Sequence, residues 1–218
     1  GFIGACTNGY IDVVKLLLDH SDIKNIDLKA KTKNGLTGFI GACFNGYIDV
    51  VKLLLDQSHI KNIDLNAKDE KGWTGFISAC INGRIDVVKL LLDHSDIKNI
   101  DLNARSFGGL TGFMLACNNG HKDVVKLLLD QSDIKNIDLN AKTEEGRTAF
   151  TSTCANGYKD VVKLLLDHSD IKNIDLNARN KNGQTGFFLA CKSGNKDVVE
   201  LLLDQSNIKN IDLNAKCK

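Results

Sequence analysis

The sequence predicts an all-α protein, a solenoid of helix–turn–helix repeats joined by short hairpin-like fingers. Three observations favour this architecture. A block of 37 residues recurs along the 218-residue chain, with 33 residues in the last copy. Each block contains two segments with helical spacing of apolar residues and then an alternating segment, which in the first five copies leads into a glycine turn. We expect a single array over residues 1–218, with repeats at 1–37, 38–74, 75–111, 112–148, 149–185 and 186–218.

The first helix of each repeat is predicted to be short and rich in small residues. Phe2, Ala5 and Cys6 stand at i, i+3 and i+4, so they share one helical face. Thr37 precedes the equivalent helix of the second repeat, and a threonine hydroxyl can accept an unpaired N–H at a helix start. The Asn8-Gly9 pair follows the helix, and glycine readily adopts positive φ. We therefore expect a threonine cap at one end and a glycine at the other.

The second helix is predicted from "IDVVKLLLDH", residues 11–20. Its apolar residues form two neighbouring stripes, one through Val13 and Leu16 and one through Val14 and Leu18, with Leu17 shared between them. This apolar arc is too wide for a single partner helix. We expect one side to pack on the first helix of the same repeat and the other on the next repeat, so a single repeat could not fold alone.

A segment with a period of two follows the second helix. In the first repeat Ile26, Leu28 and Ala30 alternate with Asp27 and Lys29, which is typical of a short extended arm. From the second repeat onward the position of Lys29 holds an asparagine, whose amide we expect to hydrogen-bond locally. These asparagines are Asn66, Asn103, Asn140, Asn177 and Asn214. A glycine turn such as "TKNGLT" then leads into the next helix.

The recurring motifs resemble the ankyrin repeat over the whole chain. They are "NG" after a small-residue helix, "DVVKLLL", and "DLNAKxxxGxT" leading into the next repeat. The resemblance implies stacked helix pairs that bind protein partners through the finger tips and the concave face of the first helices. The chain departs from the family pattern because its helices begin with Thr-Gly-Phe instead of Thr-Pro-Leu-His, and its period exceeds the usual length of about 33 residues.

The additional residues of each repeat fall near positions 21–25. An isoleucine recurs there in every repeat, so we interpret the insertion as an extra packed turn. The recurring isoleucines are Ile23, Ile60, Ile97, Ile134, Ile171 and Ile208.

Composition argues against several classes of partner. Lys and Arg total 28 against 27 for Asp and Glu, so the chain has no bulk charge that would attract nucleic acid or an anionic membrane. The longest apolar runs are far shorter than the roughly 20 residues that a membrane-spanning helix needs. We therefore expect neither a nucleic-acid partner nor a membrane partner.

The cysteines and histidines follow the repeat and do not form a metal-ligand pattern. Six cysteines occupy one position of the repeat, where small size is required, and we expect them to be reduced core residues. They are Cys6, Cys43, Cys80, Cys117, Cys154 and Cys191, with Cys217 alone in the tail. His20 alternates with Gln57 along the repeats. We expect no metal site, no cofactor and no enzymatic activity, in a cytoplasmic or other reducing intracellular compartment.

A few positions vary while the rest of the repeat stays nearly constant. In the second and third repeats the varying positions carry aromatic and aliphatic residues such as Phe44 and Trp73, whereas the later fingers become charged. Random drift of exposed positions is the alternative explanation, but drift would give mostly polar residues. Our candidate partner-binding residues are Leu36, Phe44, Asn45, Trp73, Ile81, Asn82, Phe107, Leu110, Leu115, Asn118 and Arg147.

These observations predict a non-catalytic scaffold that binds a protein partner through its finger tips and concave first-helix face. The alternative is a structural spacer or spring segment of a longer array, which the near-identity of the repeats favours. A laboratory-built repeat protein is a third interpretation. We also expect the end repeats, which lack polar caps, to permit end-to-end self-association.

Overall fold

The computed structural model describes residues 1–215 of the chain. Within this range the structure contains twelve helices and no strand, as the all-α prediction requires. The chain divides into two compact units, Gly1–Phe107 (unit 1) and Gly108–Lys218 (unit 2), and we describe each by itself. Each unit holds three helix pairs, and each pair comes from one repeat of the sequence.

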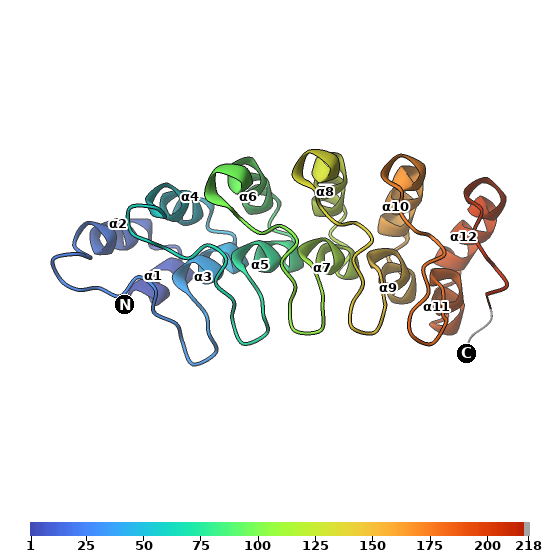
Figure 1. Ribbon diagram of the computed structural model, residues 1–218, viewed down its shortest axis with the longest axis horizontal. Helices are drawn as coiled ribbons and strands as arrows, with labels where there is room; N and C mark the ends of the chain where they lie inside the picture. Colours follow the sequence, from blue (N-terminus) through green and yellow to red (C-terminus); the bar gives the residue numbers. More distant parts are fainter. Residues whose placement is uncertain (216–218) are drawn as a thin grey trace. The chain divides into compact units, whose positions relative to one another are not determined.

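Unit 1 is built from two layers of helices (Figure 1). The first helices of its repeats pack side by side in one layer, and the second helices form the other layer. The first helices are α1 (Phe2–Thr7), α3 (Gly38–Asn45) and α5 (Gly75–Ile81), and the second helices are α2 (Ile11–Asp19), α4 (Ile48–Gln57) and α6 (Ile85–Lys98). The predicted double-sided second helix is confirmed in α4, where Val50, Val51, Leu54 and Leu55 are all buried. In α2 the prediction is wrong for one stripe, since Val13 is 46% and Leu16 58% exposed.

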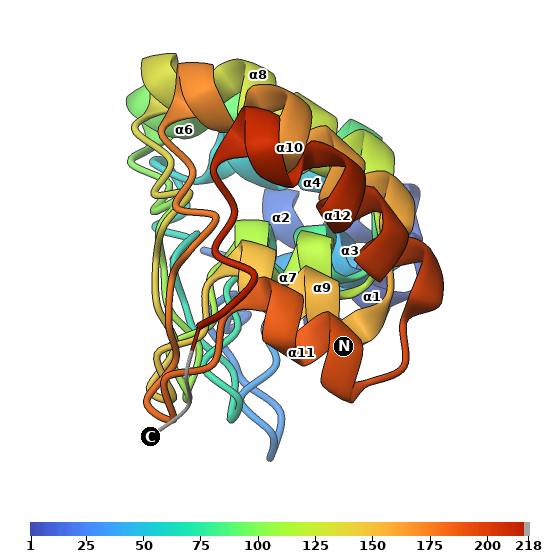
Figure 2. The ribbon, with the colours of Figure 1, turned by 90° about the vertical axis from the view of Figure 1, so that its right-hand side faces the viewer.

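Unit 2 has the same two-layer construction. Its first helices are α7 (Gly112–Asn118), α9 (Ala149–Asn156) and α11 (Gly186–Lys192), and its second helices are α8 (Lys122–Lys135), α10 (Lys159–Lys172) and α12 (Lys196–Lys209). Helices α7, α9 and α11 pack in succession, and so do α8, α10 and α12. In each unit the finger loops extend away from the helices (Figure 2).

The ends of the first helices follow the predicted local rules. Thr37 Oγ1 accepts the backbone N–H of Ile40 at 3.2 Å and caps α3. The same cap starts the later first helices, with Thr74, Thr111, Thr148 and Thr185. Gly46 then ends α3 with a φ of 85°, a conformation that a side chain would strain. Both predicted helix signals are therefore confirmed.

The insertion forms an additional turn, but its isoleucines are not packed. In α6 the inward position is taken by Ser95, which is 4% exposed and donates its hydroxyl hydrogen to the Leu92 carbonyl at 2.9 Å. Ile97 lies two residues later, about 200° around the helix, and faces outward with 72% of its surface exposed. Asn99 then adopts positive φ, and Ile100 returns the chain to the core. The prediction of a packed isoleucine is thus wrong in every repeat.

The fingers contain turns where an extended arm was predicted. Asp27 Oδ1 accepts the backbone N–H of Lys29 at 2.9 Å, which bends the chain at this point. The alternation still predicts burial, because Leu28 is buried while Asp27 and Lys29 are exposed. The tip closes as a hairpin through Thr32 N–H to Leu36 O at 3.0 Å. Within unit 1 the Glu70 N–H joins this first finger to the second at Asn34 O, at 2.9 Å.

The recurring finger asparagine links one repeat to the next, and this overturns the local hydrogen bond that we predicted. Asn66 Nδ2 donates to Asn99 O at 2.7 Å, and Asn66 Oδ1 accepts the N–H of Asp101 at 2.9 Å. In unit 2, Asn140 and Asn177 make the same two bonds to the following finger. Lys29 occupies this position in the first repeat, and a lysine side chain has no acceptor with which to reproduce the pair.

The recurring cysteines lie in the core, except that Cys191 is exposed. No disulfide joins the six that fall within residues 1–215, and Cys217 lies outside the described residues. Burial raises the pKa of the Cys6 thiol to about 12 and raises those of Cys43, Cys117 and Cys154 still further. These thiols therefore stay protonated, and a protonated thiol is a poor nucleophile.

Candidate functional site

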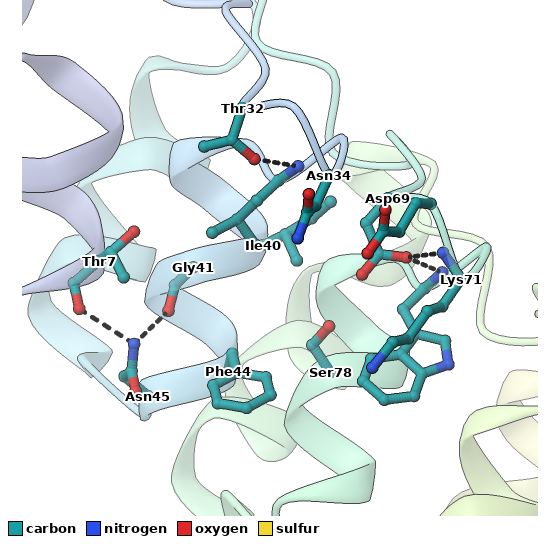
Figure 3. Close-up of a pocket in the computed structure, with 13 residues that line it drawn as sticks. Thr7, Thr32, Asn34, Ile40, Gly41, Phe44, Asn45, Asp69, Lys71 and Ser78 are labelled. Atoms are coloured by element: carbon teal, nitrogen blue, oxygen red, sulfur yellow. Dashed lines mark hydrogen bonds between the residues drawn. The ribbon is translucent and has the colours of Figure 1, made fainter.

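Four of the predicted partner-binding residues line one pocket in unit 1. The pocket has a volume of about 310 Å³ and lies between helices α3 and α5 and the tips of the first two fingers (Figure 3). This volume is at the lower end of the range of about 300–1,000 Å³ that is usual for ligand pockets. The four predicted residues are Leu36, Phe44, Asn45 and Trp73. Leu36 belongs to the first repeat and the other three to the second, where Trp73 is far along the chain from Phe44 and Asn45. The fold brings these separated side chains together.

Trp73 forms the wall of the pocket on the second finger and is half-buried. The Lys71 ammonium lies 4.7 Å from the centroid of its ring, which is a cation–π distance. Asp69 Oδ1 accepts the backbone N–H groups of Lys71 at 2.9 Å and of Trp73 at 2.8 Å. The finger tip is therefore held by its own side chain, and the tryptophan is presented from a fixed backbone.

Another part of the lining comes from α3 and the first finger. Phe44 is 40% exposed at the pocket rim, Leu36 is half-buried, and Ile40 is almost fully buried beneath them. Trp73 and Phe44 are thus aromatic side chains that are held by the fold yet keep exposed surface. Residues of this kind carry a large share of the binding energy in protein interfaces.

Two buried hydroxyl groups in the lining have no hydrogen-bond partner. They belong to Thr7 and Ser78, and the Ser78 side chain is fully buried. In Figure 3 the Ser78 hydroxyl points toward the space between Phe44 and the second finger. Thr7 is pressed against α3, because a Cβ on Gly41 would collide with Thr7 Oγ1. Buried polar atoms without a partner are uncommon in folded proteins.

Asn45 and Asn82 act on the helices themselves. Asn45 Nδ2 donates to Thr7 O at 3.0 Å and to Gly41 O at 3.2 Å, so it ties α3 to α1. Asn82 Nδ2 donates to Ser78 O at 2.8 Å at the end of α5. The "NG" asparagine therefore supports the helix end, a role that its occurrence in nearly every repeat already indicates.

The remaining predicted residues do not line this pocket. Ile81 is half-buried at the end of α5, and Phe107 is 73% exposed on the last finger of unit 1. In unit 2, Leu110 and Asn118 are half-buried and Arg147 is exposed. Leu115 was predicted to face a partner but is only 6% exposed, because its position on the first helix turns toward the helix stack.

Sequence reasoning missed Asp69, Ser78, Thr7 and Ile40 as pocket residues. A signal existed for Asp69, because the equivalent positions of the other fingers also hold small residues that can accept a local N–H. These residues are Thr32, Ser106, Thr143 and Asn180. Ser78 and Thr7 stand at positions that vary among the repeats, but their depth in the pocket depends on how neighbouring helices pack.

The described residues contain neither a metal-ligand cluster nor a helix that would suit a membrane. No three His, Cys, Asp or Glu side chains in residues 1–215 gather as metal ligands would. Each helix in that range is too short or too polar to span a bilayer. The ring nitrogens Nδ1 of His20, His94 and His168 lie 2.8–2.9 Å from a carbonyl oxygen four residues earlier, so these histidines cover the ends of second helices.

Comparison with known families agrees with this architecture. The model described as "Ankyrin repeats (3 copies)" matches residues 2–106, 58–141, 97–175 and 113–217. No curated protein matches the chain. Ankyrin repeats are in general modules of protein–protein interaction, and the overlapping matches together contain every helix pair described above. The chain belongs to the ankyrin repeat family.

Proposed function

We propose that this chain is a non-catalytic interaction module that binds a protein partner through the pocket of unit 1 and the finger tips around it. One observation carries the proposal. The framework of the repeats is nearly constant, yet two of the positions that vary, Trp73 and Phe44, are partly exposed aromatic residues in the lining of one pocket. Such a site offers anchors for a partner and no group suited to bond making or breaking.

The chemistry of the pocket supports binding over catalysis. Its ionisable groups are Asp69, Glu70 and Lys71. Asp69 is engaged by two backbone N–H groups and the Lys71 ammonium lies over the Trp73 ring, so neither is positioned to transfer a proton. Burial keeps the core cysteines protonated, and a protonated thiol is a poor nucleophile, which supports the same conclusion.

The direct test compares proteins captured from the native host by wild-type and variant baits. Trp73→Ala and Phe44→Ala should each weaken binding by about 2 kcal/mol or more, as truncation of an aromatic anchor does. Ile60→Ala is the matched control, because Ile60 is 76% exposed on the same unit but does not line the pocket. Mass spectrometry should find a partner that Ile60→Ala retains and Trp73→Ala loses.

The spacer interpretation gives a different outcome. A segment that only separates other parts of a longer array needs no specific anchor, so all three variants would capture the same proteins as the wild type. That result would remove the support for the pocket as a binding site.

A further inference from the structure

The unpaired hydroxyl groups in the lining indicate which partner side chain the pocket is suited to receive. The walls are apolar and include two aromatic rings, while the Ser78 hydroxyl is fully buried and has no partner. We propose that the pocket receives a tyrosine side chain of the partner, with the phenol ring between Phe44 and Trp73 and the phenol hydroxyl paired with Ser78. This assignment rests on the proposed function, because it names the group that the partner inserts.

A tyrosine satisfies both parts of the lining. Its ring can pack against the aromatic walls in the offset or edge-to-face arrangements that aromatic pairs favour, and its hydroxyl both donates and accepts hydrogen bonds. A phenylalanine or leucine would fill the same apolar space but leave the Ser78 hydroxyl without a partner. Leaving a buried hydroxyl unpaired is more costly than the net gain from an ordinary hydrogen bond. The pocket should therefore bind tyrosine more tightly than phenylalanine, although the two side chains differ by one oxygen atom.

Charged side chains fit less well. A basic side chain would bring a second positive charge close to the Lys71 ammonium, which lies 4.7 Å from the centroid of the Trp73 ring. An acidic side chain would approach the Glu70 and Asp69 carboxylates of the second finger. A neutral aromatic group with one polar end is the chemistry that remains.

The repeats themselves provide variants for a test. The position of Ser78 holds leucine at Leu115 and Leu189, and a second serine at Ser152 in unit 2. Ser78→Ala removes the hydroxyl alone, Ser78→Leu fills the base of the pocket with a residue that the fold accepts elsewhere, and Ser152→Ala is the matched control outside the pocket.

Trp73 is the only tryptophan in the chain and lines the pocket, so its fluorescence reports on occupancy. The probes are N-acetyl-L-tyrosinamide and N-acetyl-L-phenylalaninamide, which differ by one hydroxyl, titrated with excitation beyond the tyrosine absorption. We expect wild type and Ser152→Ala to bind the tyrosine probe at least about fivefold more tightly. Ser78→Ala should bring that ratio to about one, and Ser78→Leu should weaken both probes. Circular dichroism confirms that each variant is folded.

Equal affinity of the wild type for the two probes, failure of both to bind, or a tyrosine preference that survives in Ser78→Ala would each overturn the assignment. These outcomes are separate from the fate of the proposed function. If Trp73→Ala loses a captured partner while the probes show no preference, the interaction site stands and only the tyrosine assignment falls. If the probes behave as expected but Trp73→Ala captures every wild-type partner, the interaction proposal falls instead.

Discussion

Units 1 and 2 share one framework but present different side chains at equivalent positions. Moving three repeats along the chain takes each pocket residue of unit 1 to its counterpart in unit 2. Along this shift Leu36 becomes Arg147, Phe44 becomes Ala155, Trp73 becomes Gln184, Ile40 becomes Thr151 and Ser78 becomes Leu189. The apolar walls are thereby replaced by polar or small residues, and the hydroxyl at the base by an aliphatic chain.

This difference between the units shows that the positions that pack one helix pair on the next and the positions that face a partner are under separate constraints. Residues that join one helix pair to the next are nearly identical in both units, as in "DVVKLLL", because each must pack against the same neighbour. The finger tips meet the next repeat through backbone groups, such as Glu70 N–H to Asn34 O, so their side chains can change without altering the fold. Recognition chemistry can therefore vary on an unchanged backbone.

Truncating a core leucine should have the largest effect and should not distinguish the units. Leu54 and Leu165 are equivalent positions with no exposed surface. Leu54→Ala and Leu165→Ala should each lower stability by about 2–5 kcal/mol because a cavity replaces packed atoms. Urea unfolding followed by circular dichroism measures both. Losses that differ by more than the error of the method would break the claim that the frameworks are equivalent.

Removing the finger asparagine that links one repeat to the next should lower stability by less than truncating a core leucine. The first repeat has Lys29 at this position, so its junction differs from those that carry the asparagine. Asn66→Ala and Asn140→Ala each remove two hydrogen bonds to the next finger and should cost about 1 kcal/mol or more. Lys29→Asn should supply the missing pair at the first junction and raise stability by about 1 kcal/mol. Thermal unfolding measures the changes. A neutral or destabilising Lys29→Asn would show that the first junction does not lack this link.

The smallest expected effect concerns acid. The hydrogen bond from Lys61, at 2.6 Å, and its positive charge lower the pKa of Asp22. A lowered carboxyl pKa contributes stability that is present above the ordinary pKa and is lost as the pH falls through the lowered value, so the loss begins below about pH 4. Asp22→Asn should remove this dependence of stability on pH.

The next repeat offers the reverse experiment. His59 stands in the position equivalent to Asp22, and His59→Asp should introduce a similar dependence of stability on pH there. Thermal midpoints between pH 2 and 6 measure both, and an unchanged slope in Asp22→Asn would contradict the assignment.

The sequence predicts most of the fold because its signals act over a few residues. Thr37 and Gly46 mark helix ends by local hydrogen bonding and local backbone freedom, and both lie where they were expected. The outward direction of Ile97 could not be predicted in the same way. It depends on Ser95 taking the inward position, and this in turn depends on the helix continuing through the insertion.

The candidate site was predictable only in part. Variation among near-identical repeats identified Phe44 and Trp73, since constant positions pack and changed positions have freedom to differ. It did not identify the depth of Leu115, which is buried, or of the Ser78 hydroxyl, because the first helix is rotated toward its neighbours by an amount that periodicity does not specify. The long-range bonds of Asn66 were missed for a related reason, since their partners lie 33 and 35 residues away.

The pocket draws its lining from three consecutive repeats, with Thr7 in the first, Phe44 and Trp73 in the second, and Ser78 in the third. The contacts between repeats, by contrast, use nearly the same residues throughout. Loss or duplication of one whole 37-residue block by recombination would therefore leave each junction intact while giving a finger a new neighbour. Shuffling of interchangeable blocks can thus produce a new combination of lining residues in a single genetic event. No intermediate variant that fails to fold is required.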